Sequence, residues 1–181
     1  MAANASIVLR KATAADVAAL KDLIARSARG LRPDYRGAQV EGALRGAFGV
    51  DSQLLDDGTY FVAEMDGTIV GCGGWSFRAT LFGGDARADR NNSLLDPKTH
   101  AAKIRAFFVE PSHARQGIGS RLLERCEQEA RAHGFSHVEL MATLPGVKLY
   151  AVRGYTGQET VRYDVGLGES IEFIPMRKNL T

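Results

Sequence analysis

The sequence contains few of the residues that would announce a metal or redox protein. Only two cysteines, Cys72 and Cys126, occur among 181 residues. Each lies among apolar neighbours, and neither belongs to a pair spaced for a metal ion. No cysteine pair lies near any of the four histidines. We therefore expect no metal site, and we interpret the cysteines as reduced core thiols of a cytoplasmic protein.

Long apolar runs and an excess of charge of one sign are also absent. No stretch approaches the roughly 20 apolar residues of a membrane-spanning helix, and the first residues do not resemble a signal peptide. The formal net charge is only +2, which does not argue for nucleic acid or an acidic membrane surface as a partner. With 45% hydrophobic residues, the chain fits a single globular domain over residues 1–181.

Hydrophobic periodicity predicts a mixed α/β (α+β) domain, because strand and helix patterns follow one another without a regular βαβ repeat. The dipeptide Asp66-Gly67 suits a two-residue hairpin turn, and Pro175 indicates an edge position for the last strand. Gly71, Gly73 and Gly74 predict a bulge or a close approach of another backbone. Strands are expected at 6–11, 60–65, 68–77, 103–110, 137–143, 158–165 and 170–177, and helices at about 14–29, 38–48, 118–133 and 145–152.

A polar connection over residues 79–101 separates the third expected strand from the fourth. It contains Gly83-Gly84, Asn91-Asn92 and Pro97 and shows no hydrophobic periodicity. Connections of this length within a compact domain tend to be functional or mobile. The sequence does not indicate which of the two applies here.

The segment Ala114–Ser120 lies between an apolar strand and an amphipathic helix. Gly117 and Gly119 permit a tight turn and let an anion approach the backbone without a Cβ in the way. The first N–H groups of a helix have no intrahelical partner and carry the positive end of the dipole. The segment therefore predicts a phosphate site, in which Arg115 adds a charge-assisted contact. Its expected binding residues are Arg115, Gln116, Gly117, Ile118, Gly119 and Ser120.

Three classes of nucleotide site compete for this turn. A Walker loop requires a lysine that the segment lacks. A dinucleotide fingerprint requires a third glycine where Leu122 stands, although Glu139 lies at the spacing of its ribose-binding acid. The turn also follows a predicted hairpin past the middle of the chain rather than the first strand. Coenzyme A is the third class of ligand for this turn.

The turn resembles motif A of the GNAT superfamily of N-acetyltransferases, R/Q-x-x-G-x-G/A. Gly117 and Gly119 match its glycines, whereas Ala114 departs from its first position and removes one side-chain contact. The segment 107–111 and the order of elements from Ser6 to Lys178 also resemble the family. The resemblance implies a mixed, mostly antiparallel sheet of six to seven strands, flanked by about four helices and splayed between the fourth and fifth strands.

The same resemblance implies acetyl-CoA as the cosubstrate and direct transfer in a ternary complex. The main chain of Phe107, Phe108 and Val109 would bind the pantetheine like an added strand, and the Val109 N–H would donate to the acetyl oxyanion. The segment 149–155 resembles Leu-Tyr-x-x-x-Gly-Phe and makes Tyr150 the candidate general acid for the departing thiolate. Neither cysteine lies in a setting typical of a nucleophile, which disfavours an acetyl-enzyme.

The general base remains open at this point, because the first half of the fourth strand contains no acid. Glu110, Glu139, His113 or a water molecule could serve, and an amine that arrives neutral would need none of them.

The acceptor is expected to be a primary amine of a small molecule. The resemblance places Tyr35, Trp75, Phe77 and Arg78 near its pocket. Alternatives are an amine of a protein or peptide and a non-catalytic acetyl-CoA-binding sensor. Members of the superfamily are often homodimers.

Overall fold

A computed structural model of the protein describes residues 6–181. Its seven strands form one sheet in the order β1-β2-β3-β4-β5-β7-β6, and all neighbours are antiparallel except β4 and β5. The strands are β1 (Val8–Lys11), β2 (Tyr60–Met65), β3 (Thr68–Ser76), β4 (Ala102–Val109), β5 (His137–Thr143), β6 (Val161–Gly166) and β7 (Glu169–Asn179). The predicted fold class is confirmed.

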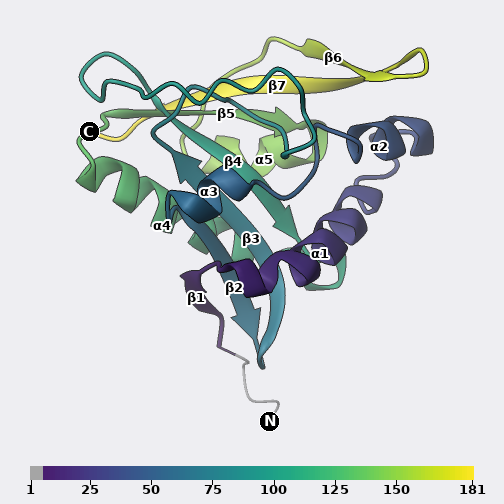
Figure 1. The fold of residues 1–181 in the computed structure, drawn as a ribbon, viewed down its shortest axis with the longest axis horizontal. Coiled ribbons are helices and arrows are strands. Elements are labelled where there is room, and N and C mark those ends of the chain that lie inside the picture. Colours follow the sequence, from purple (N-terminus) through teal and green to yellow (C-terminus); the bar gives the residue numbers. More distant parts are fainter. Residues whose placement is uncertain (1–5) are drawn as a thin grey trace.

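Helices cover both faces of this sheet (Figure 1). They are α1 (Val17–Arg29), α2 (Gly37–Ala43), α3 (Ser52–Asp56), α4 (Ile118–Ala132) and α5 (Val147–Val152), with 3-10 turns η1 (Ala14–Asp16), η2 (Pro111–His113) and η3 (Leu144–Gly146). Buried residues of α1, α2 and α3 share one core with Val62 and Phe108. Buried residues of α4 form a second core with Phe61 and Tyr150. The strands β2, β3, β4, β5 and β7 therefore contribute side chains to two separate cores, one on each face of the sheet.

Most predicted elements are present, and the helix α3 is an addition to them. Asp51 caps it by accepting a hydrogen bond from the Leu54 N–H at 3.3 Å. The helix has only five residues, which is too short for a helical hydrophobic period to show. The predicted hairpin turn is confirmed, because Asp66 and Gly67 both have positive φ, at 51° and 76°, as a type I′ turn requires.

The prediction that Pro175 marks an edge strand is wrong for β7 as a whole, since β7 lies between β5 and β6. Arg177 exchanges two main-chain hydrogen bonds of 2.9 Å with Thr156 on the side away from β5. Pro175, two residues earlier, directs its nitrogen to that same side. The β6 ladder begins only at Val161, opposite Phe173. Pro175 therefore lies where β7 is locally unpaired and needs no N–H donor.

The glycines of β3 are explained by close approach and by a bulge opposite them. A Cβ on Gly73 would lie 2.6 Å from the Phe107 ring, and one on Gly74 would lie 2.8 Å from the Thr59 carbonyl oxygen. The β3–β4 register shifts between Cys72 and Gly74, and Ala106 on β4 has φ of 60°. This bulge re-aims β4 where it leaves β5.

Candidate functional site

The predicted phosphate turn is an exposed run of main-chain N–H groups. Gly117 has φ of 82° and precedes the first residue of α4, and Arg115 has φ of 62°. The first helical hydrogen bond is donated by Arg121 to the Gly117 carbonyl at 3.0 Å. Within residues 6–181, the N–H groups of residues 115–120 have no protein acceptor. We call residues 115–120 the N–H cradle, and the cradle can accept an anion at the positive end of α4.

Two features keep the cradle open and positively charged. A Cβ on Gly117 would meet no atom within 4 Å, so the space in front of the turn is clear. Arg153 approaches from the end of α5, and its Nε donates to the Ser120 hydroxyl at 3.2 Å. This arginine brings a second guanidinium near the cradle besides the predicted Arg115.

The sheet opens beside the cradle, between β4 and β5. Their ladder covers only three residue pairs and ends at Ile104, opposite Leu140. Glu110 donates its N–H to Val70 of β3 at 2.8 Å. The main-chain groups of Val109 point the other way, toward the open side, because successive strand residues alternate. The predicted splay is therefore confirmed, and it leaves residues 107–109 without a neighbouring strand on that side.

A pocket lies in this opening and extends to the α1–α2 face of the sheet. Phe107 and Tyr150 line it on the α4 side, where their rings meet at 6.5 Å in a T-shaped arrangement. Val109 lies at the other end of the gap, where its side chain would be 3.9 Å from a Cβ on Gly119. The gap thus connects the N–H cradle with the pocket. The remaining lining residues are Ala47, Phe48, Gly49, Leu81, Phe82, Gly83, Ile104, Arg105, Ala106, Phe108, Leu140, Met141, Thr143 and Phe173.

Tyr150 enters the pocket from the short helix α5. Its ring also packs against Tyr155 at 5.7 Å between centroids. Within residues 6–181, its hydroxyl has no hydrogen-bond partner. Burial is the main influence on its pKa and raises it well above the ordinary phenol value. The hydroxyl therefore remains protonated around neutral pH and can donate.

Neither cysteine is placed to attack a thioester. Cys72 and Cys126 are both buried and unpaired thiols. Burial raises the pKa of Cys72 to about 12 and that of Cys126 well above its usual range. The Cys72 thiol donates to the Ala106 carbonyl at 3.5 Å. Neither thiol forms a thiolate readily, which argues against a covalent intermediate.

The three protein candidates for the general base all lie outside the pocket. Glu110 pairs with Arg26 of α1 at 2.8 Å. Glu139 pairs with Lys103 of β4. His113 lies in the 3-10 turn η2, next to the Ser112 hydroxyl at 3.1 Å. The structure does not bring any of them to Tyr150.

Trp75 and Phe77 lie on the face of the sheet opposite to the expected acceptor side. Trp75 is fully buried in the α4 core, and its indole N–H donates to Glu129 at 3.2 Å. Phe77 packs on the indole with ring centroids 5.8 Å apart. Neither lines the pocket, and the contacts that the structure gives both side chains are packing contacts. The alternation along β3 sends these two side chains toward α4.

Tyr35 and Arg78 also make structural contacts rather than lining the pocket. The Tyr35 hydroxyl donates to the Glu172 carbonyl at 2.6 Å and accepts from the Leu144 N–H at 2.8 Å. It ties the α1–α2 connection to β7 and to η3. Arg78 forms a two-point pair with Asp57, at 2.8 and 2.9 Å.

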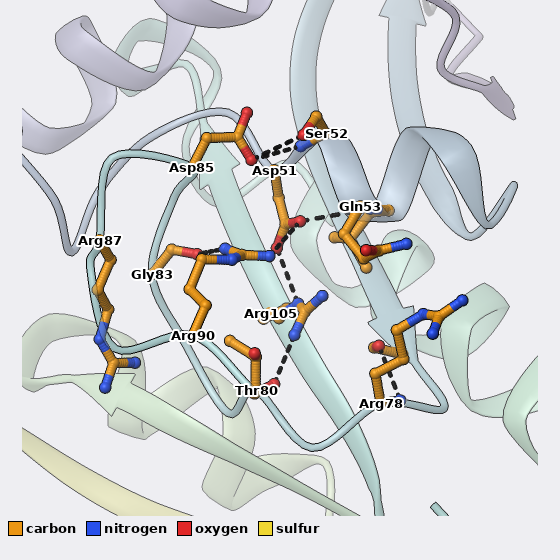
Figure 2. Close-up of polar contacts among 12 residues, drawn as sticks. Asp51, Ser52, Gln53, Arg78, Thr80, Gly83, Asp85, Arg87, Arg90 and Arg105 are labelled. Carbon is orange, nitrogen blue, oxygen red and sulfur yellow. Dashed lines mark hydrogen bonds and ion pairs between the residues drawn. The ribbon is translucent and has the colours of Figure 1, made fainter. Parts of the chain in front are cut away.

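Sequence reasoning missed a buried ion cluster beside the pocket, which Figure 2 shows. Asp51 and Arg105 meet at 2.8 Å with side chains that are each 1% exposed. Arg90 reaches the same carboxylate at 2.9 Å. Two signals could have found it, namely an arginine within the apolar strand β4 and an aspartate in the capping position before α3.

Comparison with known proteins places this fold and site in a family. Residues 18–155 match the family model for the acetyltransferase (GNAT) family. The protein named IAA acetyltransferase from Azospirillum brasilense is 34% identical over 89 residues, which are 48% of this chain and 46% of that protein. The match thus spans about half the length of this relative.

Solved structures share the whole fold. A GCN5-related N-acetyltransferase from Rhodopseudomonas palustris superimposes with a TM-score of 0.70 at 20% identity, and 99% of each chain is covered. YncA from Salmonella typhimurium with its cofactor acetyl-CoA superimposes with a TM-score of 0.65 at 18% identity, covering 97% of this chain and 95% of that one. PaiA N-acetyltransferase from Thermoplasma acidophilum in complex with coenzyme A superimposes with a TM-score of 0.64 at 16% identity, covering 96% of this chain and 99% of that one. The family model matches most of the chain, the sheet splays between β4 and β5, and the glycine turn precedes α4. The chain therefore belongs to the GNAT family of acetyltransferases.

Proposed function

We propose that this protein transfers an acetyl group from acetyl-CoA to a primary amine of a small molecule, directly and within a ternary complex. The observation that carries the proposal is that the open side of β4 forms a path from the N–H cradle, beside Val109, to the pocket that contains Tyr150. Neighbours of the same fold were solved with acetyl-CoA or coenzyme A. The path supplies separate places for the anionic and the reactive ends of such a molecule.

The residues present fit acetyl-CoA. The N–H cradle offers donors that have no acceptor within residues 6–181, and Gly117 has no side chain that would fill the open space in front of the turn. The open side of residues 107–109 can bind an extended amide-containing arm in the manner of an added strand. The N–H of Val109 points to that side and is the candidate donor to an oxyanion. When bound, acetyl-CoA supplies a thioester whose carbonyl carbon accepts the amine.

Tyr150 then acts as the general acid. Its hydroxyl is held inside the pocket by packing against Phe107 and Tyr155, and burial keeps it protonated. The departing sulfur of coenzyme A takes this proton as the amide bond forms.

No Asp, Glu or His side chain lines the described pocket. The amine therefore loses its proton to water, or it enters in the neutral form.

The decisive experiment replaces Tyr150 by phenylalanine. Thiol titration measures the release of coenzyme A with each member of a panel of primary amines. In this assay Tyr150→Phe should lower kcat about 10²- to 10⁴-fold. Calorimetry should give the same acetyl-CoA Kd for both proteins, because the hydroxyl does not contact the cradle. An unchanged kcat would remove Tyr150 from the mechanism. Acetyl-CoA binding without release of coenzyme A by any amine would favour a sensor instead.

A further inference from the structure

The connection over residues 79–101, which we call the strap, is packed tightly onto the segment before α3. The Gly84 N–H donates to the Gly46 carbonyl at 2.9 Å, and the Asp85 N–H donates to the Val50 carbonyl at 3.0 Å. A Cβ on Gly84 would lie only 2.7 Å from the Gly49 Cα. The strap therefore forms a fixed wall of the pocket, to which it contributes Leu81, Phe82 and Gly83.

Phe82 is the aromatic side chain of this wall. Its ring centroid lies 5.1 Å from that of Tyr163 and 5.3 Å from that of Phe173. The Arg87 guanidinium lies 4.0 Å from its centroid, and Arg87 also donates to the Phe82 carbonyl at 2.6 Å. The cation and the hydrogen bond hold the ring from the strap side. Phe48, Phe108 and Phe173 complete an aromatic enclosure on this side of the sheet.

Arg105 is the one charged residue among the described residues that line the pocket, and its charge is already engaged. Its Nε pairs with Asp51, and its Nη1 donates to the Thr80 carbonyl. Its remaining nitrogen is buried without a hydrogen-bond partner, and in Figure 2 it points toward the side of Gln53 and Arg78, not toward the strap.

The neighbouring charged groups of the cluster are likewise engaged by protein partners. Arg90 pairs with Asp51 and donates to the Gly83 carbonyl. The Asp85 carboxylate accepts from the Ser52 N–H and hydroxyl, at 2.8 and 3.0 Å. The Asp51 carboxylate thus holds both guanidinium groups, and the Asp85 carboxylate is held by Ser52 (Figure 2). Among the described residues, the pocket lining therefore holds no charged side chain besides Arg105, and Arg105 is paired with Asp51.

From this enclosure we infer that the acceptor is a primary amine whose remainder is apolar and aromatic and carries no second charge. The inference rests on the proposed acetyl transfer and specifies its acceptor class. A carboxylate or a second ammonium would lose its water here and would find no charged side chain besides Arg105, which Asp51 already holds; this strongly disfavours its burial. An aryl ring would meet Phe82 and Phe173 edge to face.

The test compares amines that differ in charge but little in shape. Phenylalaninamide and phenylalanine are nearly isosteric, and only phenylalanine has a carboxylate. We expect kcat/KM to be at least about tenfold higher for phenylalaninamide than for phenylalanine. 2-Phenylethylamine should also be a substrate, and putrescine should be at least about tenfold poorer than it. Equal or faster reaction of phenylalanine or putrescine would overturn the inference.

Arg87→Met tests whether the strap sets this preference. Loss of the cation over Phe82 should raise KM for 2-phenylethylamine about three- to tenfold, with no change in KM for acetyl-CoA. Arg125→Met is the matched control, because that guanidinium lies 5.4 Å from the Phe61 centroid on the α4 side. It should leave both KM values unchanged. If Arg87→Met fails to fold, Phe82→Leu repeats the test with the ring removed and an apolar side chain kept.

The outcomes separate the two proposals. Failure to bind acetyl-CoA in calorimetry would overturn the proposed function itself. Binding of acetyl-CoA without turnover of 2-phenylethylamine and phenylalaninamide would overturn the acceptor class alone. A rise in KM for acetyl-CoA in Arg87→Met equal to the rise for the amine would show a general structural effect and would overturn the role of the strap.

Discussion

The two ends of the path are built in different ways. The cradle end uses consecutive main-chain groups of residues 115–120, which are exposed apart from the first turn of α4. The acceptor end uses the side chains of Phe48, Phe82 and Phe173, which come from three segments far apart in the chain. One end depends on backbone conformation and the other on packing and buried charge. Substitutions should therefore affect the two ends separately.

The largest predicted effect concerns the acceptor end, where Asp51 joins α3, β4 and the strap. Asp51→Asn leaves Arg105 buried, since both side chains are 1% exposed, and it removes the ionic partner of Arg90. Breaking a buried pair in this way typically destabilises a protein by about 3–5 kcal/mol. We expect a loss of that size in the free energy of unfolding, measured with urea.

Asp89→Asn is the control for Asp51→Asn, because Asp89 pairs with Arg87 at 2.6 Å but its side chain is 64% exposed. Its stability should not change measurably. The comparison also makes a prediction for binding. Folded Asp51→Asn protein should retain the acetyl-CoA affinity of the wild type, since the cradle shares no contact with Asp51. A parallel loss of stability and of acetyl-CoA affinity would show that the two ends are coupled.

At the cradle end, Gly117→Ala should weaken acetyl-CoA binding. A left-handed conformation costs a residue with a Cβ about 1–2 kcal/mol, and the methyl group would enter the anion's place. We expect Kd to rise roughly tenfold by calorimetry. Gly168 in the β6–β7 turn has φ of 73°, and a Cβ there would likewise meet no atom within 4 Å. Gly168→Ala therefore reproduces the strain, and its acetyl-CoA Kd should equal that of the wild type.

This difference between the ends also explains how far the sequence could be interpreted. The cradle is indicated by a short motif, because it depends on neighbours within about one strand and one turn. The splay and the role of Tyr150 are implied by the resemblance to the family. The alternation of β5 and the apolar stripe of α4 likewise carry their own burial pattern. The edge position predicted from Pro175 is wrong for β7, because the unpaired edge that a proline requires extends over only a few residues of this strand.

The acceptor end could not be predicted in this way. Phe82 lies in a segment without periodicity, and its place depends on Gly84 passing over Gly49. The family resemblance places Trp75 near the acceptor because this residue precedes the strap, but the alternation of β3 turns its side chain toward α4. A candidate residue near a loop therefore needs its strand face established before a role is assigned to it.

The smallest predicted effect is the absence of an alkaline decrease in kcat, and it concerns Tyr150, where the two ends meet. Burial raises the pKa of this phenol, so the proton-donating form persists at every pH below the ordinary value of about 10. With saturating 2-phenylethylamine, kcat should rise or stay level up to that pH, because only the amine gains reactivity by deprotonation. An alkaline decrease with a midpoint below 10 that disappears in Tyr150→Phe would mean that the phenol titrates freely. The pocket would then be wetter than its aromatic lining indicates, and the exclusion of charged acceptors would lose its physical basis.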